Sequence, residues 1–232
     1  MSLAEVRTLW QLFRGMPAGA SHAGRLEAFY APQAGHYDGF RERLLPGRRE
    51  LLVWLAPSPG ERIVELGAGT GRNPAFLGPQ VADLGELTLV DLCPSLLAQA
   101  RQRWAHAGNV HVVEADACTW QPPAPVDAVY FSYALSMIPD WHAAMANAVA
   151  MLRPGGRLAV VDFTLLPQQS ALAKHFWRRW FGHDGVHLNE EHGARLRELL
   201  PRHELREYRT PIPYLPGLTV PCYQFLGIKP AP

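Results

Sequence analysis

Short apolar runs alternate with stretches of helical spacing along most of the chain. Apolar runs predict buried strands at about 61–66, 86–92, 110–114, 126–131 and 157–162, and the intervening spacing predicts helices at 48–55, 73–77, 94–106 and 140–152. The pattern then predicts helices at about 170–181 and 190–200 and two closing strands near 203–210 and 220–228. This alternation predicts a parallel, doubly wound α/β sheet with ligands at the carboxyl ends of its strands.

The first 48 residues precede this alternation. Residues 2–14 carry apolar side chains at mainly helical spacing, with Trp10 and Phe13 beside Arg7 and Arg14, and predict an amphipathic helix. Its apolar face could pack on the domain or on a neighbouring subunit, or lie at a membrane surface. Residues 16–24 have the Gly/Ala/Pro composition of a linker. We expect an N-terminal part at 1–48 and one domain at 49–232.

Composition and charge exclude several classes of protein. The chain has 232 residues, 48% hydrophobic content and a formal net charge of +1, which suits one sizeable core and gives no global reason to expect a nucleic-acid partner. Its three cysteines are far apart and lack metal-type spacing, so neither a disulfide framework nor a metal site is indicated. A signal peptide and a spanning apolar run are also missing, which predicts a cytoplasmic protein.

Three alternating glycines follow the first predicted strand. Gly67, Gly69 and Gly71 remove the Cβ atoms that would keep a ligand off the backbone. The dinucleotide-binding pattern G-x-G-x-x-G would need its third glycine where this chain has Arg72, so a nicotinamide-dependent reductase is disfavoured.

The form E-x-G-x-G-x-G at residues 65–71 resembles motif I of class I S-adenosylmethionine (SAM) methyltransferases. Asp91, at the end of the second strand, could accept both ribose hydroxyls, and Asp116 stands where the resembling enzymes contact the adenine amino group. Taken singly, Asp91 could instead be a helix cap before Pro94, and Asp116 a solvated turn acid.

This resemblance implies S-adenosyl-L-methionine as cofactor and S-adenosyl-L-homocysteine as product. It also implies a Rossmann-like, mostly parallel seven-stranded sheet with an antiparallel closing strand and helices on both faces. The implied cofactor-binding residues are Tyr37, Arg41, Glu65, Gly67, Ala68, Gly69, Thr70, Gly71, Asn73, Asp91, Leu92, Asp116, Ala117, Ser132 and Tyr133. Asp127 precedes its apolar run, so we expect it to start that strand rather than to catalyse.

The segments that flank the SAM motifs resemble a narrower family. Residues 30–48, 175–185 and 213–228 are similar to blocks of the methyltransferase component of betaine-lipid (diacylglyceryl-trimethylhomoserine) synthase. That resemblance implies three N-methylations of diacylglyceryl-homoserine, while the broader resemblance to class I methyltransferases implies a lid within the N-terminal part and an acceptor-binding insertion at about 163–202. It also implies a separate aminocarboxypropyl transferase that supplies the substrate.

Such a reaction suggests residues for the acceptor. Each transfer needs a neutral amine, so His36 or Tyr37 could remove a proton, and Tyr133 stands in the position of motif IV, which lines the methyl-transfer centre. Aromatic rings suit a growing methylammonium group, and an arginine suits the carboxylate. The implied acceptor-binding residues are Tyr30, Trp177, Arg178, Arg179 and Tyr214, with Arg41 in reserve. Arg178 and Arg179 could equally form the solvated face of an amphipathic helix.

Other functions remain open at this point. The acceptor could be phosphatidylethanolamine, a quinone ring or a secondary metabolite, and a SAM-binding protein without turnover would carry the same glycine turn. A lipid acceptor would favour peripheral attachment to the inner face of the membrane through residues 1–15.

Overall fold

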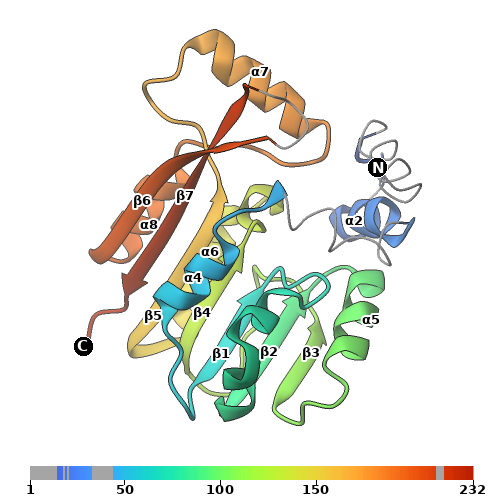
Figure 1. Cartoon of the computed structure of the whole chain (residues 1–232), viewed down its shortest axis with the longest axis vertical. Coiled ribbons are helices and arrows are strands. Elements are labelled where there is room, and N and C mark those ends of the chain that lie inside the picture. Colours follow the sequence, from blue (N-terminus) through green and yellow to red (C-terminus); the bar gives the residue numbers. More distant parts are fainter. Residues whose placement is uncertain (1–14, 18, 20, 33–43, 213–216, 232) are drawn as a thin grey trace.

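The computed structural model of the protein describes residues 15–17, 19, 21–32, 44–212 and 217–231. Its core is one seven-stranded sheet with the order β3-β2-β1-β4-β5-β7-β6 (Figure 1). The strands are β1 (Arg62–Leu66), β2 (Glu86–Asp91), β3 (Val110–Glu114), β4 (Val126–Ser132), β5 (Leu152–Phe163), β6 (Arg202–Pro211) and β7 (Thr219–Ile228). β7 runs antiparallel to both neighbours and the other six strands run parallel, which confirms the predicted sheet.

Helices cover both faces of the sheet. On one face α4 (Arg48–Leu55) and the 3-10 segment η2 (Asn73–Asp83) pack on side chains such as Ile63. On the other face α6 (Trp141–Met151) and α8 (His192–Leu199) pack on side chains such as Val64. Consecutive strand residues point to opposite faces, so the nearly continuous apolar runs of the central strands are buried on both sides.

Three elements differ from their predicted bounds. Helix α2 (His22–Tyr30) begins inside the predicted linker, because the Ser21 Oγ accepts a hydrogen bond from the Gly24 N–H (3.1 Å) and caps the first turn. η2 extends beyond residue 77, with a break at Gly78, where φ is 59°. β5 starts at Leu152, which pairs with Val126, and the register then shifts so that Ala128 pairs with Arg157. Residues 153–156, which separate the predicted helix at 140–152 from the predicted strand at 157–162, therefore form an irregularity within β5.

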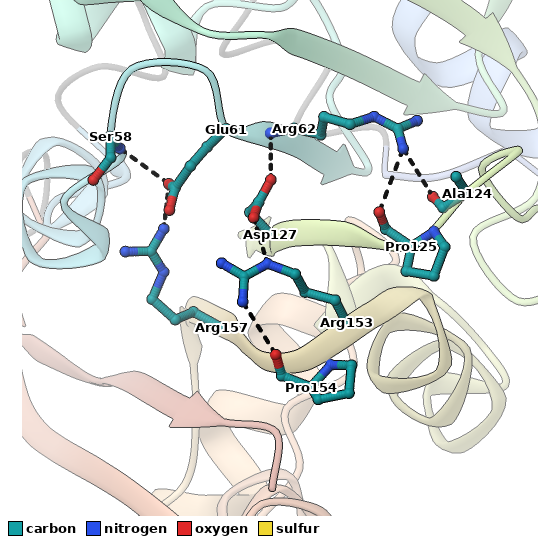
Figure 2. Close-up of polar contacts among 9 residues, drawn as sticks. All are labelled: Ser58, Glu61, Arg62, Ala124, Pro125, Asp127, Arg153, Pro154 and Arg157. Atoms are coloured by element: carbon teal, nitrogen blue, oxygen red, sulfur yellow. Dashed lines mark hydrogen bonds and ion pairs between the residues drawn. The ribbon is translucent and has the colours of Figure 1, made fainter. Parts of the chain in front are cut away.

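The amino-terminal edge of the sheet is held by charged side chains (Figure 2). Asp127 accepts hydrogen bonds from the Arg62 backbone N–H (2.7 Å) and the Arg153 Nε (2.5 Å), and Arg157 pairs with Glu61. These contacts join the starts of β1, β4 and β5 at the end opposite to the cofactor motifs. Asp127 thus stands at the start of its strand, as predicted.

Two further α-helices follow β2 and β5. α5 (Pro94–Arg103) packs beside β2 and β3, and α7 (Ala171–Gly182) stands at the top of Figure 1, with α2 lower and to its right. Across the described ranges no helix is long and apolar enough to cross a membrane. The predictions for residues 2–14, His36, Tyr37, Arg41 and Tyr214 fall outside those ranges.

Candidate cofactor and acceptor site

A cavity of about 280 Å³ opens at the carboxyl ends of β1, β2 and β4. It brings together most of the predicted cofactor residues. Those that line it are Gly67, Ala68, Gly69, Thr70, Asn73, Asp91, Leu92, Asp116, Ala117, Ser132 and Tyr133.

The glycine turn forms the floor of this cavity. Gly67, Gly69 and Gly71 all have positive φ values, of 74°, 55° and 63°. A Cβ at Gly67 would collide with the Ala134 Cβ, so only glycine fits both the backbone conformation and the space. The Trp104 Nε1 donates to the Gly71 carbonyl (2.8 Å) and the Arg103 Nη1 to the Thr70 carbonyl (2.5 Å), which fixes the turn from beneath.

Asp91 hydrogen-bonds the backbone just before α5 and also faces the cavity. Its Oδ2 accepts from the Gly69 N–H (2.8 Å) and its Oδ1 from the Cys93 N–H (2.8 Å) at the start of α5. Burial raises the pKa of this carboxyl above its usual value, while these backbone hydrogen bonds favour the charged form. Each carboxylate oxygen keeps a second lone pair, so the two oxygens can still accept hydrogen bonds from two ribose hydroxyls.

Asp116 lies at the opposite wall in the loop after β3. Its side chain is exposed, and its Oδ1 accepts from the Cys118 N–H (2.8 Å). Asp116 is thus an exposed acid in a turn, as one alternative from the sequence had it, and it also lines the cavity.

Glu65 acts on the cavity through another residue. Its side chain is fully buried, accepts from the Asn73 Nδ2 (2.5 Å) and the Tyr130 hydroxyl (2.8 Å), and is absent from the lining. The Asn73 Oδ1 accepts in turn from the Arg48 Nη1 (3.1 Å). Burial raises the pKa of Glu65 to about 7, so this carboxyl is only partly charged at neutral pH.

The end of β4 forms the third wall. Tyr133 has a φ of 56°, which is strained for a non-glycine residue, and its hydroxyl donates to the Pro46 carbonyl (2.6 Å). Burial holds the pKa of Tyr133 well above its usual value, so the hydroxyl stays protonated and serves as a donor rather than a base. The neighbouring Ser132 Oγ is buried and, within the described part of the chain, lacks a hydrogen-bond partner, which leaves it for a ligand.

A buried acid that the sequence analysis did not single out orders the loop after β4. Asp162, at the end of β5, accepts from the Ser136 Oγ (2.7 Å) and the Ser136 N–H (2.9 Å). Burial raises its pKa to about 6. The loop that it holds contributes Met137, Ile138 and Pro139 to the cavity. An acid at a strand end, the signal used for Asp91, would have found it.

A second hollow of about 350 Å³ adjoins the cofactor cavity, and the two share His22, Met137 and Pro139. Basic side chains border this hollow. Arg25 comes from the first turn of α2, and His183 and His187 come from the segment after α7. The His22 Nδ1 is buried without a hydrogen-bond partner among the described residues. The sequence analysis named none of the four, because no motif marks them.

The predicted acceptor residues are only partly brought to these hollows. Tyr30 lines the cofactor cavity, and its hydroxyl donates to the Met137 Sδ (3.1 Å). Trp177 is instead buried beneath α7, where its ring lies 5.9 Å from that of Phe181. Arg178 and Arg179 are exposed, and Arg178 pairs with Glu190 (2.9 Å). Of the two alternatives for these arginines, their positions fit the solvated face of an amphipathic helix.

Comparison with known proteins agrees with this geometry. Residues 63–156 match the family model described as "Methyltransferase domain". The chain is 30% identical over 164 residues to the ubiquinone/menaquinone biosynthesis C-methyltransferase UbiE of Roseobacter denitrificans, a match that covers 67% of this chain and 65% of that protein. The chain thus spans just under two thirds of that relative's length.

Solved structures share the fold at low sequence identity. The N-methyltransferase NodS from Bradyrhizobium japonicum in complex with S-adenosyl-l-homocysteine has a TM-score of 0.67 and 20% identity, covering 88% of this chain and 98% of that one. The phosphoethanolamine N-methyltransferase 2 of Haemonchus contortus in complex with phosphomonomethylethanolamine and S-adenosylhomocysteine has a TM-score of 0.72 and 16% identity, covering 93% and 61%.

The glycine turn, Asp91 and the unpartnered Ser132 hydroxyl fit S-adenosylmethionine, the cofactor of the protein family to which the matched domain belongs. The predicted fold, cofactor and enzyme class are confirmed at this level. The chain has the fold of the SAM-dependent methyltransferases, and its residues 63–156 match a methyltransferase-domain family.

Proposed function

We propose that the chain is an N-methyltransferase that transfers three methyl groups from S-adenosylmethionine to the amino group of diacylglyceryl-homoserine. The observation that carries this proposal is the second hollow, which has a basic border and shares three lining residues with the cofactor cavity. An acceptor that holds an amine and an anion a few bonds apart can place the amine in the cavity and the anion in the hollow.

The basic border suits a carboxylate. Arg25 supplies a charged donor, and the ring of His22, whose pKa is lowered by its burial and by Arg25, supplies a neutral N–H donor. These side chains replace Arg178 and Arg179 as the predicted clamp for the homoserine carboxylate. The Haemonchus contortus neighbour, whose structure contains phosphomonomethylethanolamine, also takes a headgroup that combines an amine with an anion.

The amine end meets aromatic rings. The Tyr133 and Phe163 rings lie 4.7 Å apart at the cavity wall, with Tyr30 and Met137 beside them. Ring faces stabilise methylammonium groups by roughly 0.5 to 2 kcal/mol each. Since the cofactor supplies an already activated methyl group, the residues of the chain mainly orient the amine and exclude water. His36 and Tyr37 remain the proposed bases, because the Tyr133 hydroxyl stays protonated.

Mass spectrometry of lipids tests the proposal. The purified chain is incubated with S-adenosylmethionine and vesicles that contain either diacylglyceryl-homoserine or phosphatidylethanolamine. We expect one, two and three added methyls on the homoserine lipid alone. Methylation of phosphatidylethanolamine alone would contradict the acceptor assignment, and S-adenosylmethionine binding without any S-adenosylhomocysteine formed would favour a non-catalytic binding protein.

A second candidate function is C-methylation of a quinone ring, favoured by the relatives named as ubiquinone/menaquinone C-methyltransferases. A quinone precursor carries no carboxylate beside the reacting carbon, so the basic hollow would have no role in its binding. The same assay with a demethylquinol distinguishes the two, because ring methylation adds one methyl group and stops.

Several features of the cell biology follow from the lipid acceptor. The enzyme would be cytoplasmic and would work at the inner face of the membrane, where its acceptor lies. A separate aminocarboxypropyl transferase would have to supply the diacylglyceryl-homoserine.

A further inference from the structure

Helix α7 presents a stripe of large apolar side chains to solvent. Leu172 is 84% exposed, Phe176 42% and Trp180 46%. They stand four residues apart and therefore lie on one side of the helix, and the Phe176 and Trp180 ring centroids are 5.9 Å apart. Exposed apolar side chains are ordinary when scattered singly, but a contiguous set marks an interaction surface.

The opposite side of α7 faces the substrate-binding end of the molecule. Trp177 is buried there, and the Phe181 ring lies 4.8 Å from that of Phe163, which lines the cofactor cavity. The segment just after α7 contributes His183 and His187 to the second hollow. The exposed stripe therefore lies on the side of α7 away from Trp177 and Phe181.

All the charged side chains of α7 are positive. The helix carries three Lys and Arg residues and no acidic residue, although the whole chain has a net charge of only +1. Lys174 and Arg178 share one acid from outside the helix, Glu190, at 2.6 and 2.9 Å. Arg179 is exposed and stands three residues after Phe176, and exposed His175 stands three after Leu172, so both border the stripe.

We propose that α7 docks the protein on an anionic lipid bilayer, with Leu172, Phe176 and Trp180 inserted at the headgroup level. Aromatic and aliphatic side chains beside cations, without acids, match the composition of helices that lie in the membrane interface. Negative lipid headgroups complement Arg179 and the net positive charge that Lys174 and Arg178 keep with their single shared acid, with each unpaired Lys or Arg contributing on the order of 1 kcal/mol. Docking in this way holds the site near the bilayer, whichever membrane-held acceptor it uses.

Vesicle co-sedimentation tests this surface. The full chain is compared with a Phe176→Ser/Trp180→Ser variant, on phosphatidylcholine vesicles with and without phosphatidylglycerol. We expect the wild type to bind the phosphatidylglycerol vesicles, less so at high salt, and the double variant to bind at least about five-fold more weakly. Val53→Ser, at a 70% exposed side chain on α4, is the matched control and should bind as the wild type does. Both variants should keep wild-type affinity for S-adenosylmethionine.

Three results would overturn the proposal. One is equal vesicle binding by the wild type and the double variant, including the case in which deletion of residues 1–14 alone abolishes binding. A second is the absence of wild-type binding to either kind of vesicle. The third is a wild-type dimer that the double variant converts to a monomer without a change in vesicle binding, which would assign the stripe to a second copy of the chain.

Discussion

The two sides of the substrate site are built in different ways. The cofactor wall, made of residues 65–73 with Asp91, is shaped by backbone: three glycines at positive φ and a carboxylate held by two amide N–H groups. The wall that we propose for the acceptor, called the acceptor wall below, is made of α2, residues 135–139 and residues 182–187, and side chains from these three distant segments shape it. The shape of the cofactor wall thus depends on a short stretch of sequence, whereas the shape of the acceptor wall depends on how distant segments pack together.

Because of this difference, the two walls should respond differently to substitutions. A backbone cradle fails when a Cβ is added, whereas a wall of side chains changes its affinity by increments when one group is replaced. We therefore expect substitutions in the cofactor wall to act on S-adenosylmethionine binding, and those in the acceptor wall to act on the acceptor alone.

The largest effect is expected for Gly67→Ala. The added methyl group meets Ala134 and imposes a strained φ of 74°, so S-adenosylmethionine affinity should fall by about 1,000-fold, or about 4 kcal/mol. Isothermal titration calorimetry measures this loss. Gly78→Ala is the control, because φ there is 59° but the space beyond it is empty, so only stability should fall. Equal S-adenosylmethionine affinities in the two variants would show that the glycine turn does not determine cofactor binding.

Glu65→Gln should change how stability depends on pH. The pKa of Glu65 rises from 4.5 to about 7 on folding, so its stabilising contribution is present below pH 4.5 and is lost as pH rises through 7. The loss amounts to roughly 3 kcal/mol at 1.36 kcal/mol per pKa unit. Urea unfolding between pH 4.5 and 8 should show this decline in the wild type and a shallower one in the variant, in which only the raised pKa of other buried acids such as Asp162 still contributes. A slope unchanged by Glu65→Gln would contradict the prediction.

Asp91→Asn tests the ribose contact. Loss of one charged acceptor should weaken S-adenosylmethionine binding by about 30-fold, since hydrogen bonds to charged groups contribute about 1.5 to 3 kcal/mol. The remaining Asn oxygen can still cap one backbone amide, so the melting temperature should change little. Asp83→Asn, at an exposed end of η2, serves as control and should bind normally. Normal binding by Asp91→Asn would leave this residue as a helix cap only.

The smallest effect is expected for Arg25→Gln on the acceptor wall. KM for the homoserine lipid should rise about five-fold, equivalent to about 1 kcal/mol, while kcat and S-adenosylmethionine affinity stay unchanged. Arg25→Lys should recover part of the loss, and Arg101→Gln on the exposed side of α5 should have no effect. Equal changes in KM for acceptor and cofactor would show that the walls are not independent.

The same contrast explains what the sequence could predict. The sheet and the cofactor wall follow from local patterns: apolar runs define strands, and glycine spacing with a strand-end acid defines the turn. Gly71 and Glu65 are predicted to bind the cofactor, but neither lines the cavity, and both instead make hydrogen bonds outside it. Motif spacing does not show which residues face the cavity.

The acceptor wall was harder to predict because it depends on packing between distant segments. His22 and His187 come together only when α2 and the segment after α7 meet across the loop at 135–139. The start of β5 at Leu152 likewise depends on its register with Val126. Ser21 and the helical spacing of Leu26, Phe29 and Tyr30 were a local signal for α2, and the Gly/Ala/Pro composition around them obscured it.

The position of β7 between β5 and β6 has a consequence for dynamics. β6 joins the sheet only through β7, so the two strands form a hairpin whose docking on β5 closes a long stretch of chain. The Gln224 side chain on β7 donates to the Gly47 carbonyl (2.8 Å), next to Arg48 of the Glu65 network. Opening of the hairpin and loosening of the cofactor wall should therefore occur together. We expect S-adenosylmethionine to slow amide hydrogen exchange in β7, a strand that supplies no residue to the cavity lining.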